Sequence, residues 1–216
     1  MITKTKQRQH KLFSFKRLPM DIARLVCSPL LLLYRMKRVT PTGAKYKGHI
    51  KGGAILAANH TTFSDTFLVG VAVWYRRMFF LAAEVVMKTK LRAWLLGGVG
   101  AIKIDREAAD IEAIRKSVGL LKEGYLLTIF PQGGITQGED VGTLKSGAAM
   151  IALQAGVPIV PMYICPKKKW YNRRVVVIGD PIDPKKYIEK KFPSTADIER
   201  ISQVLTAEMN RCAAHQ

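Results

Sequence analysis

Apolar and polar positions alternate along the chain in blocks that predict strands and helices in turn. Six short runs are almost continuously apolar, which is typical of strands buried on both faces of a sheet. We interpret these runs as strands at residues 54–58, 78–83, 101–104, 125–130, 157–164 and 174–178. The fifth run begins V-P-I-V-P, and proline cannot donate a ladder hydrogen bond. We therefore expect that strand to be irregular or to lie at an edge of the sheet.

Helices are predicted between these strands by apolar residues at three- and four-residue spacing. Ile111, Val118 and Leu121 recur in this way, and Gly156 is placed to end the following helix. Ser194 with Asp197 resembles a capping box before the last helix. The predicted helices run from 64 or 65 to about 75, over 90–96, 108–122 and 144–155, and from 194 to about 212. This alternation predicts an α/β fold whose mostly parallel central sheet is flanked by helices.

The positive charge is concentrated at the N-terminus. The 216 residues carry a net charge of +19, and residues 1–51 hold 13 Lys and Arg but one acid, Asp21. The same region contains an apolar segment, 18–34, which is too short to cross a bilayer. Basic residues beside a short apolar helix predict a membrane-interface segment over residues 1–48, preceding an α/β domain over 49–216. A solvated basic arm and a nucleic-acid-binding arm are the alternatives.

The cysteines and a second basic cluster exclude few classes of function. The cysteines Cys27, Cys165 and Cys212 include no C-x-x-C pair, so we expect neither a disulfide framework nor a cysteine zinc site. A second basic cluster with aromatics lies at 167–174. It could stack on bases, sit at a lipid headgroup boundary or be a solvated loop, and we favour the loop.

Candidate catalytic residues follow the strand at 54–58. In a parallel sheet, sites collect at the carboxyl ends of strands, and here the chain reads N-H-T-T-F-S-D. His60 and Asp65 would meet if the histidine lies in the turn and the aspartate in the first helical turn. The carboxylate would fix the tautomer of the imidazole, which could then take a proton from a hydroxyl. The alternative is a helix-capping aspartate beside an ordinary turn residue.

Two other strand ends carry residues suited to anions. Arg106 follows the strand at 101–104, and its guanidinium fits a phosphate or carboxylate, although a surface ion pair is the alternative. The strand at 125–130 runs into a loop with Gly133 and Gly134, whose backbone N–H groups could face an oxyanion or phosphate. A plain tight turn is the alternative there.

Taken together and in this order, these segments resemble the glycerolipid acyltransferase family, whose bacterial members include 1-acylglycerol-3-phosphate (lysophosphatidic acid) acyltransferases. The resemblance covers roughly residues 50–185. The matching segments are N-H-T-T-F-S-D at 59–65, G-A-I-K-I-D-R at 100–106, F-P-Q-G-G at 130–134, L-K-S-G-A-A-M-I-A-L at 144–153, V-P-I-V-P at 157–161 and G-D-P-I at 179–182.

The resemblance implies a role for each motif. His60 would be the general base, oriented by Asp65, and a lipid hydroxyl would attack the thioester of acyl-CoA or acyl-carrier protein directly, with no acyl-enzyme, metal or cofactor. Arg106 would be the main ligand of the acceptor's phosphate, and Lys103 is a second candidate. The acceptor site would be shaped by Gln132, Gly133 and Gly134, and the acyl pocket supported by Val157, Pro158, Ile159, Val160 and Pro161.

One loop departs from the family pattern. The family usually has F-P-E-G-T-R or F-P-E-G-T-S, whereas this chain has Gln132, Gly134 and Ile135 in place of the acid, the threonine and the last residue. Lysophosphatidic acid, giving phosphatidic acid, is the expected acceptor, and another lysolipid is the alternative. A catalytically inactive lipid-binding homologue is a further alternative. The expected partners are the lipid surface at the cytoplasmic face of the cell membrane, a lysophospholipid and acyl-carrier protein, but not nucleic acid.

Overall fold

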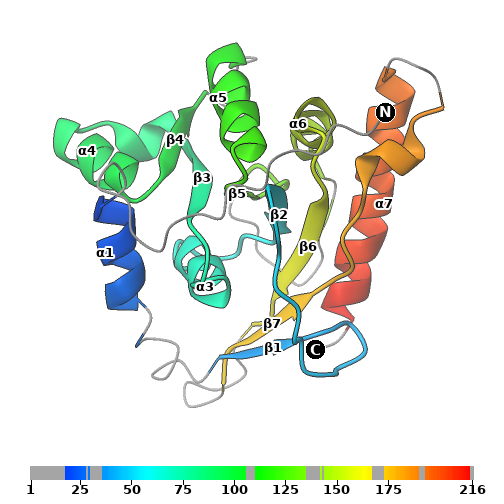
Figure 1. The fold of residues 1–216 in the computed structure, drawn as a ribbon, viewed down its shortest axis with the longest axis horizontal. Helices are drawn as coiled ribbons and strands as arrows, with labels where there is room; N and C mark the ends of the chain where they lie inside the picture. Colours follow the sequence, from blue (N-terminus) through cyan, green and yellow to red (C-terminus); the bar gives the residue numbers. More distant parts are fainter. Residues whose placement is uncertain are drawn as a thin grey trace.

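The fold is described here from a computed structural model. It describes residues 18–27, 29, 36–105, 110–134, 142, 144–166, 173–189 and 193–214. One seven-stranded sheet in the order β1-β7-β6-β2-β5-β3-β4 forms its centre (Figure 1). The strands are β1 (Lys37–Val39), β2 (Ala54–Ala58), β3 (Met78–Ala83), β4 (Ala101–Ile104), β5 (Leu126–Ile129), β6 (Ile159–Ile164) and β7 (Val175–Ile178).

The pairing confirms the predicted mostly parallel sheet. Strands β6, β2, β5, β3 and β4 are parallel to one another, whereas β7 runs antiparallel to β6 and carries β1 parallel to itself at the sheet edge. The helices are α1 (Leu18–Cys27), α3 (Asp65–Ala72), α4 (Lys90–Gly98), α5 (Ile111–Lys122), α6 (Gly147–Ala155) and α7 (Thr195–Ala213), with 3-10 helices η2 (Glu84–Met87) and η3 (Pro184–Tyr187). The predicted helices and strands therefore exist, with ends displaced by a few residues.

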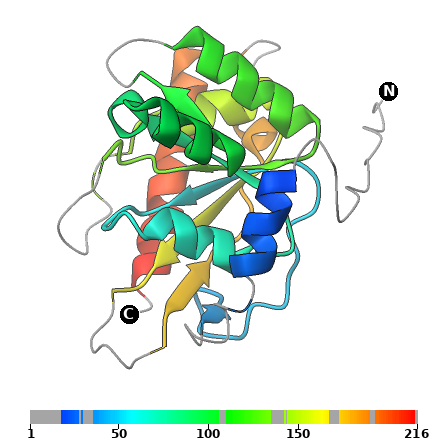
Figure 2. The same cartoon turned by 90° about the vertical axis from the view of Figure 1, so that its left-hand side faces the viewer.

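Helices cover the two faces of the sheet unequally. Helices α5, α6 and α7 pack on one face, whereas α3 packs on the other, with α1 beside it (Figures 1 and 2). Successive side chains of a strand point to opposite faces, so β2 serves both cores. Ile55 and Ala57 belong to the cluster under α5–α7, and Ala54, Leu56 and Ala58 belong to the cluster under α3.

One of the two alternatives predicted for β6, an edge position, is wrong. The strand lies inside the sheet, between β2 and β7, and is not at an edge. Pro158 precedes the strand, and its carbonyl accepts from the N–H of Ile55. Pro161 accepts from the N–H of Gly179, directly after β7 ends at Ile178. Pro161, which has no N–H to donate, therefore lies opposite the end of β7, its antiparallel partner strand.

Local capping signals are confirmed where the side chains bond to nearby backbone. Ser194 accepts from the N–H of Asp197 and the carboxylate of Asp197 accepts from the N–H of Ser194, which is the predicted capping box. Gly156 ends α6 with φ 68°, a left-handed conformation that favours glycine. Asp110 caps α5 by accepting from the N–H of Ala113, so this helix begins later than predicted.

Part of the predicted N-terminal segment belongs to the α/β domain. β1 is an edge strand of the common sheet. Helix α1 is attached through Asp21, which is 3% exposed and accepts two hydrogen bonds of 2.8 Å from the guanidinium of Arg77. In the described parts of the chain, no helix is both long and apolar enough to span a bilayer. The other parts of the predicted segment, 1–17, 28 and 30–35, lie outside the described residues.

Candidate active site

The turn after β2 is fixed to the sheet by an asparagine. The side-chain Nδ2 of Asn59 donates to the carbonyl of Ile164 at 3.2 Å, and the N–H of Ile164 donates to Oδ1 of Asn59 at 2.7 Å. This pair of bonds imitates one step of a strand ladder between the ends of β2 and β6. The residue that follows, His60, therefore leaves the sheet from a fixed position.

His60 and Asp65 come together in the predicted way. Asp65 opens helix α3, and its Oδ2 lies 3.4 Å from Nδ1 of the imidazole. Both side chains are buried, with the aspartate 1% exposed. This distance is at the long end of the range for a hydrogen bond.

The same carboxylate closes the turn. Oδ2 of Asp65 accepts from the backbone N–H groups of Thr61 and Thr62, each at 2.6 Å, and Oδ1 accepts from the Thr62 hydroxyl at 2.8 Å. Burial raises the pKa of Asp65, but the hydrogen bonds from His60, Thr62 and Thr61 together hold the pKa below its ordinary value of 3.8. The group facing the imidazole is therefore a stable carboxylate. The helix-capping alternative is wrong, because Ser64 is the N-cap residue of α3 and the N–H groups bound by Asp65 belong to the turn before the helix.

The loop after β5 contacts the histidine from two sides. Oε1 of Gln132 accepts from the backbone N–H of His60 at 2.7 Å. The ring of Phe130 stacks on the imidazole, with centroids 4.2 Å apart and planes inclined by 21°. Gln132 thus fixes the backbone of His60 and Phe130 fixes its ring, although the two residues lie 72 and 70 positions further along the chain.

The two glycines of this loop have different surroundings. Gly133 has φ 76°, and its N–H donates to the carbonyl of Phe130 inside the turn. A Cβ on Gly133 would come within 2.7 Å of the Lys145 side chain. The tight turn thus occupies the N–H of Gly133 that was considered for an oxyanion, whereas a Cβ on Gly134 would meet open space.

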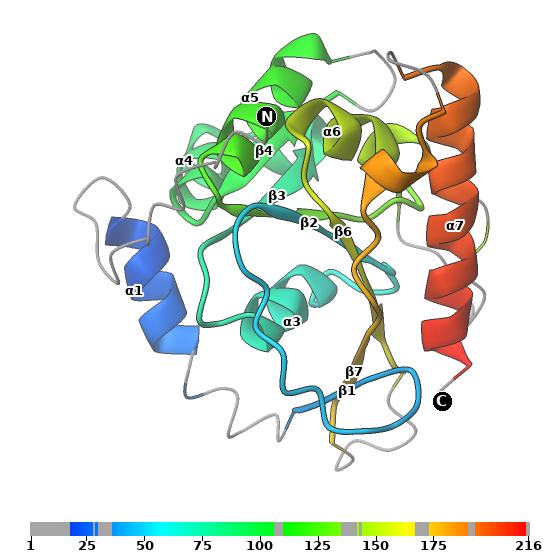
Figure 3. The same ribbon diagram turned by 45° about the vertical axis from the view of Figure 1, so that its right-hand side comes forward.

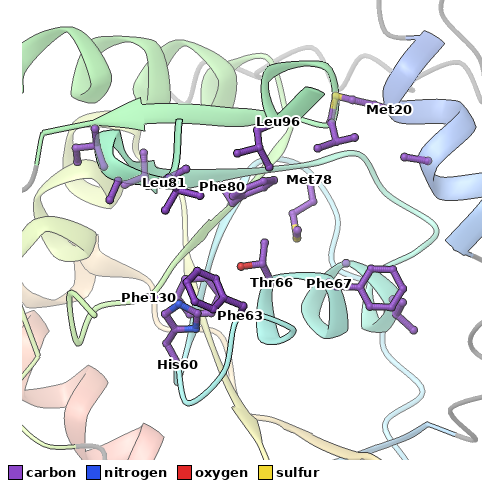
Figure 4. Close-up of a pocket in the computed structure, with 18 of the residues that line it drawn as sticks. Met20, His60, Phe63, Thr66, Phe67, Met78, Phe80, Leu81, Leu96 and Phe130 are labelled. Atoms are coloured by element: carbon purple, nitrogen blue, oxygen red, sulfur yellow. The ribbon is translucent and has the colours of Figure 1, made fainter. Parts of the chain in front are cut away.

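A large apolar cavity begins at His60. Its volume is about 1000 Å³, and Figure 4 shows His60 and Phe130 at one end of the lining and Met20 of α1 at the other. Strand β3 and helix α3 form opposite walls, with Phe80 and Thr66 between the two ends. The lining also includes Phe63, Phe67, Gly70, Val71, Trp74, Met78, Leu81, Leu96 and Val99. Such a space suits a hydrocarbon chain whose reactive end lies near the imidazole.

The residues expected to bind phosphate and the acyl chain either do not line this cavity or lie outside the described residues. Lys103 does not line the cavity, and its Nζ forms an exposed ion pair of 2.6 Å with Glu84. Arg106 lies outside the described residues. Residues 157–161 do not line the cavity either, because Ile159 and Val160 point into the two cores of the sheet.

Sequence reasoning gave no individual role to several residues that shape the site. Asn59 and Phe130 stood in the matching motifs, but only the folded chain shows that one bonds to β6 and the other to His60. The cavity walls had no sequence signal, since the spacing between α3 and β3 creates them. Among the described residues, no three His, Cys, Asp or Glu side chains form a cluster that could hold a metal ion.

Known proteins with similar sequences are acyltransferases. The chain is 33% identical over 109 residues to a 1-acyl-sn-glycerol-3-phosphate acyltransferase of Bacillus subtilis, covering 50% of this chain and 54% of the relative. The corresponding Streptococcus pneumoniae enzyme is 33% identical over 163 residues, which are 73% of this chain and 59% of the relative. The chain thus matches a little more than half the length of each. A lyso-ornithine lipid O-acyltransferase of Pseudomonas aeruginosa is 32% identical over 108 residues, 50% of this chain and 41% of the relative.

A solved structure shares the fold. The 1-acyl-sn-glycerophosphate acyltransferase PlsC of Thermotoga maritima superposes with a TM-score of 0.61 at 20% identity, covering 91% of this chain and 82% of that one. The family profile described as Acyltransferase matches residues 35–165, which include both His60 and Asp65. On this match, the chain belongs to the acyltransferase family.

Proposed function

We propose that the protein transfers a fatty acyl group from acyl-CoA or acyl-carrier protein to the free hydroxyl of a lysophospholipid. The acceptor that we favour is 1-acylglycerol-3-phosphate, which would give phosphatidic acid. The observation that carries the proposal is a buried His–Asp pair at one end of a long apolar cavity. The curated relatives from two bacteria, which are named for this reaction, support the same acceptor.

The proposed reaction needs one base and no enzyme-bound intermediate. His60 takes the proton of the acceptor hydroxyl while that oxygen attacks the thioester carbonyl. The new C–O bond forms, the C–S bond breaks, and the proton passes from the imidazole to the leaving thiolate. Asp65 stays ionised throughout and stabilises the charged imidazole, which is consistent with its lowered pKa.

We place the acyl chain in the cavity between α3 and β3, in place of the predicted pocket at 157–161. Thr66 and Phe80 would flank the chain, and Met20 would lie near its far end. Arg106, which follows the cavity-lining Asp105, remains the proposed ligand of the acceptor's phosphate. Gln132 then acts through the backbone of His60.

Thiol release with a panel of lysolipids tests this proposal. Wild type should release thiol only when an acceptor is present, with acyl-CoA or with acyl-carrier protein, and His60→Ala should be slower by roughly 100- to 10,000-fold. An unchanged unfolding midpoint for His60→Ala would show that the fold is retained. If wild type shows no acceptor-dependent release with either donor, the chain is a lipid-binding homologue without this activity.

A second variant tests the placement of the acyl chain. A Cβ on Gly70 would meet only Met78, at 3.6 Å, so Gly70→Leu should grow into the cavity without displacing backbone. We expect the preferred donor chain to become shorter by several carbons. An unchanged chain-length profile would show that the acyl group lies elsewhere.

A lysolipid with an amine-bearing head is the second candidate acceptor. The acidic residues Glu84 and Asp105 line the cavity, and the loop lacks the acid at 132 and the Arg or Ser at 135 that the family usually has. The similarity to a lyso-ornithine lipid acyltransferase favours the same alternative. In the lysolipid panel, a higher kcat/KM for lyso-ornithine lipid than for lysophosphatidic acid would decide in its favour.

A further inference from the structure

The exposed apolar side chains gather on the side of the molecule that holds the cavity. Among the described residues, twelve large apolar side chains are exposed, and eleven of them lie on α1, η2 or α4, or within two residues of the ends of α3 or α4. The exception is Ile111 on α5, at the other face of the sheet. Soluble surfaces rarely concentrate apolar groups in this way without a partner.

Two helices present the same apolar pattern. Leu91, Trp94 and Leu95 are exposed on α4, at positions i, i+3 and i+4, and therefore share one helix face. Ile22, Leu25 and Val26 repeat this spacing on α1. We name these six residues the apolar patch. Helices α1 and α4 lie on the same side of the fold, as Figures 1 and 3 show.

The surroundings of the apolar patch are basic. Lys88, Lys90 and Arg92 are exposed at the start of α4, and the sequence from 85 to 104 contains no Asp or Glu. The one acid of α1, Asp21, is buried against Arg77 and adds no negative charge to the outer face. Cations flanking apolar and tryptophan side chains are complementary to an anionic lipid leaflet.

Both helices also line the cavity. Met20 and Ala23 of α1 and Leu96 of α4 belong to the cavity wall, so each helix turns one side inward and another side outward. Pro19 and Gly98 bring the two helices close together, because a Cβ on Gly98 would lie 3.5 Å from Pro19. The elements that carry the apolar patch are therefore the same ones that bound the proposed acyl site.

We infer that α4 and α1 together dock on an anionic bilayer, with the apolar patch inserted at the headgroup boundary. Helix α4 would thus give the protein a second contact with the membrane, in addition to the N-terminal segment that the sequence pattern predicts to lie at the membrane interface. This inference deepens the proposed function, since an acceptor lipid would reach the cavity from the surface on which the protein sits. Docking itself requires no acyl transfer.

Vesicle sedimentation of the full chain tests the apolar contribution. The probe is phosphatidylcholine vesicles with one quarter phosphatidylglycerol, in 0.5 M salt, which screens the basic residues. We expect the partition coefficient to fall about tenfold or more for Leu91→Ser/Trp94→Ser. The matched control is Leu91→Ser against Ile111→Ser, since these side chains are 65% and 67% exposed. Equal partition of wild type and the double variant would overturn the inference.

The contribution of the basic residues of α4 to vesicle binding is tested at low salt with the same vesicles. Lys88→Gln/Lys90→Gln/Arg92→Gln should weaken binding about fivefold per removed cation. The control, Lys116→Gln/Lys122→Gln on α5, should change binding less than twofold. The inference is wrong if the α4 variant binds vesicles normally but raises the KM for acyl-carrier protein, because the basic surface would then dock an acidic protein.

Fluorescence gives a readout that is independent of activity. The chain has three tryptophans, so Trp74→Phe/Trp170→Phe leaves Trp94 as the sole emitter. Vesicles with brominated acyl chains should quench this emission, and the absence of quenching would contradict insertion. If quenching occurs but wild type transfers no acyl group, the docking inference stands and the proposed function fails.

Discussion

The two faces of the sheet are built for different purposes. On the face covered by α5, α6 and α7, alternate strand residues and three helices form a continuous core. On the other face, α3 covers the central strands, and the space between it and β3 is a cavity of about 1000 Å³. The first face, which we call the closed face, therefore contributes most to the stability of the fold. The second, which we call the open face, is packed less completely and contains the cavity.

The largest effect is expected at the buried ion pair between Asp21 and Arg77, which attaches α1 on the open face. Asp21→Ala should lower the free energy of unfolding by about 3–5 kcal/mol, because the buried guanidinium of Arg77 loses the ion pair and both hydrogen bonds to this carboxylate. Asp21→Leu/Arg77→Met should cost less than the single change. Urea denaturation measures both, and Arg200→Gln, which breaks an exposed pair with Glu189, serves as the control with little change in midpoint.

Truncation of one leucine on each side tests the comparison directly. Leu205→Ala, on α7 and 1% exposed, should cost about 2–5 kcal/mol of unfolding free energy, whereas Leu96→Ala in the cavity wall should cost about 1 kcal/mol or less. The difference follows because Leu96 already borders empty space. Equal costs in thermal or urea unfolding would show that the open face is packed like the closed one.

The loop after β5 offers a smaller, kinetic test. Gln132→Leu removes the acceptor for the N–H of His60 and should lower kcat by about tenfold, an effect near 1.4 kcal/mol. Gln132→Glu retains an acceptor oxygen, so kcat should fall less. Its effect is expected in acceptor affinity and not in acyl-chain preference. Identical kinetics for wild type and Gln132→Leu would exclude this residue from positioning the histidine.

The smallest effect concerns acid stability. The folded-state pKa of Asp65 lies below its ordinary value of 3.8, so its carboxylate stabilises the fold above that pH. This contribution is lost as the pH falls through the lowered pKa, where the folded carboxylate takes up a proton. Asp65→Asn should therefore be less stable than wild type at pH 6, with the difference narrowing below pH 4. Unfolding midpoints across this range measure it, and a constant difference would contradict the mechanism.

Features set by neighbours in the sequence were predictable. The capping box at Ser194, the left-handed Gly156 and the turn that brings His60 to Asp65 each involve residues a few positions apart. Their geometry depends on local backbone conformation and needs no knowledge of the tertiary fold. The mostly parallel sheet also followed from the alternation of the elements.

Features set by distant contacts were not predictable. β1 is three residues long and includes Lys37 and Arg38, so it has no apolar run, and its pairing with β7 places it in the sheet. The interior position of Pro161 depends on where β7 ends. The cavity, likewise, arises from the distance between α3 and β3, which no single residue pattern encodes.

The side chain of Asn59 has a consequence for exchange of amide hydrogens with solvent. Its oxygen holds the N–H of Ile164, at the last residue of β6, as a neighbouring strand would. That amide should therefore exchange deuterium as slowly as those in the middle of the sheet. The exchange rate of this one amide therefore measures, without any substrate, how stably the turn that carries His60 is bonded to the sheet.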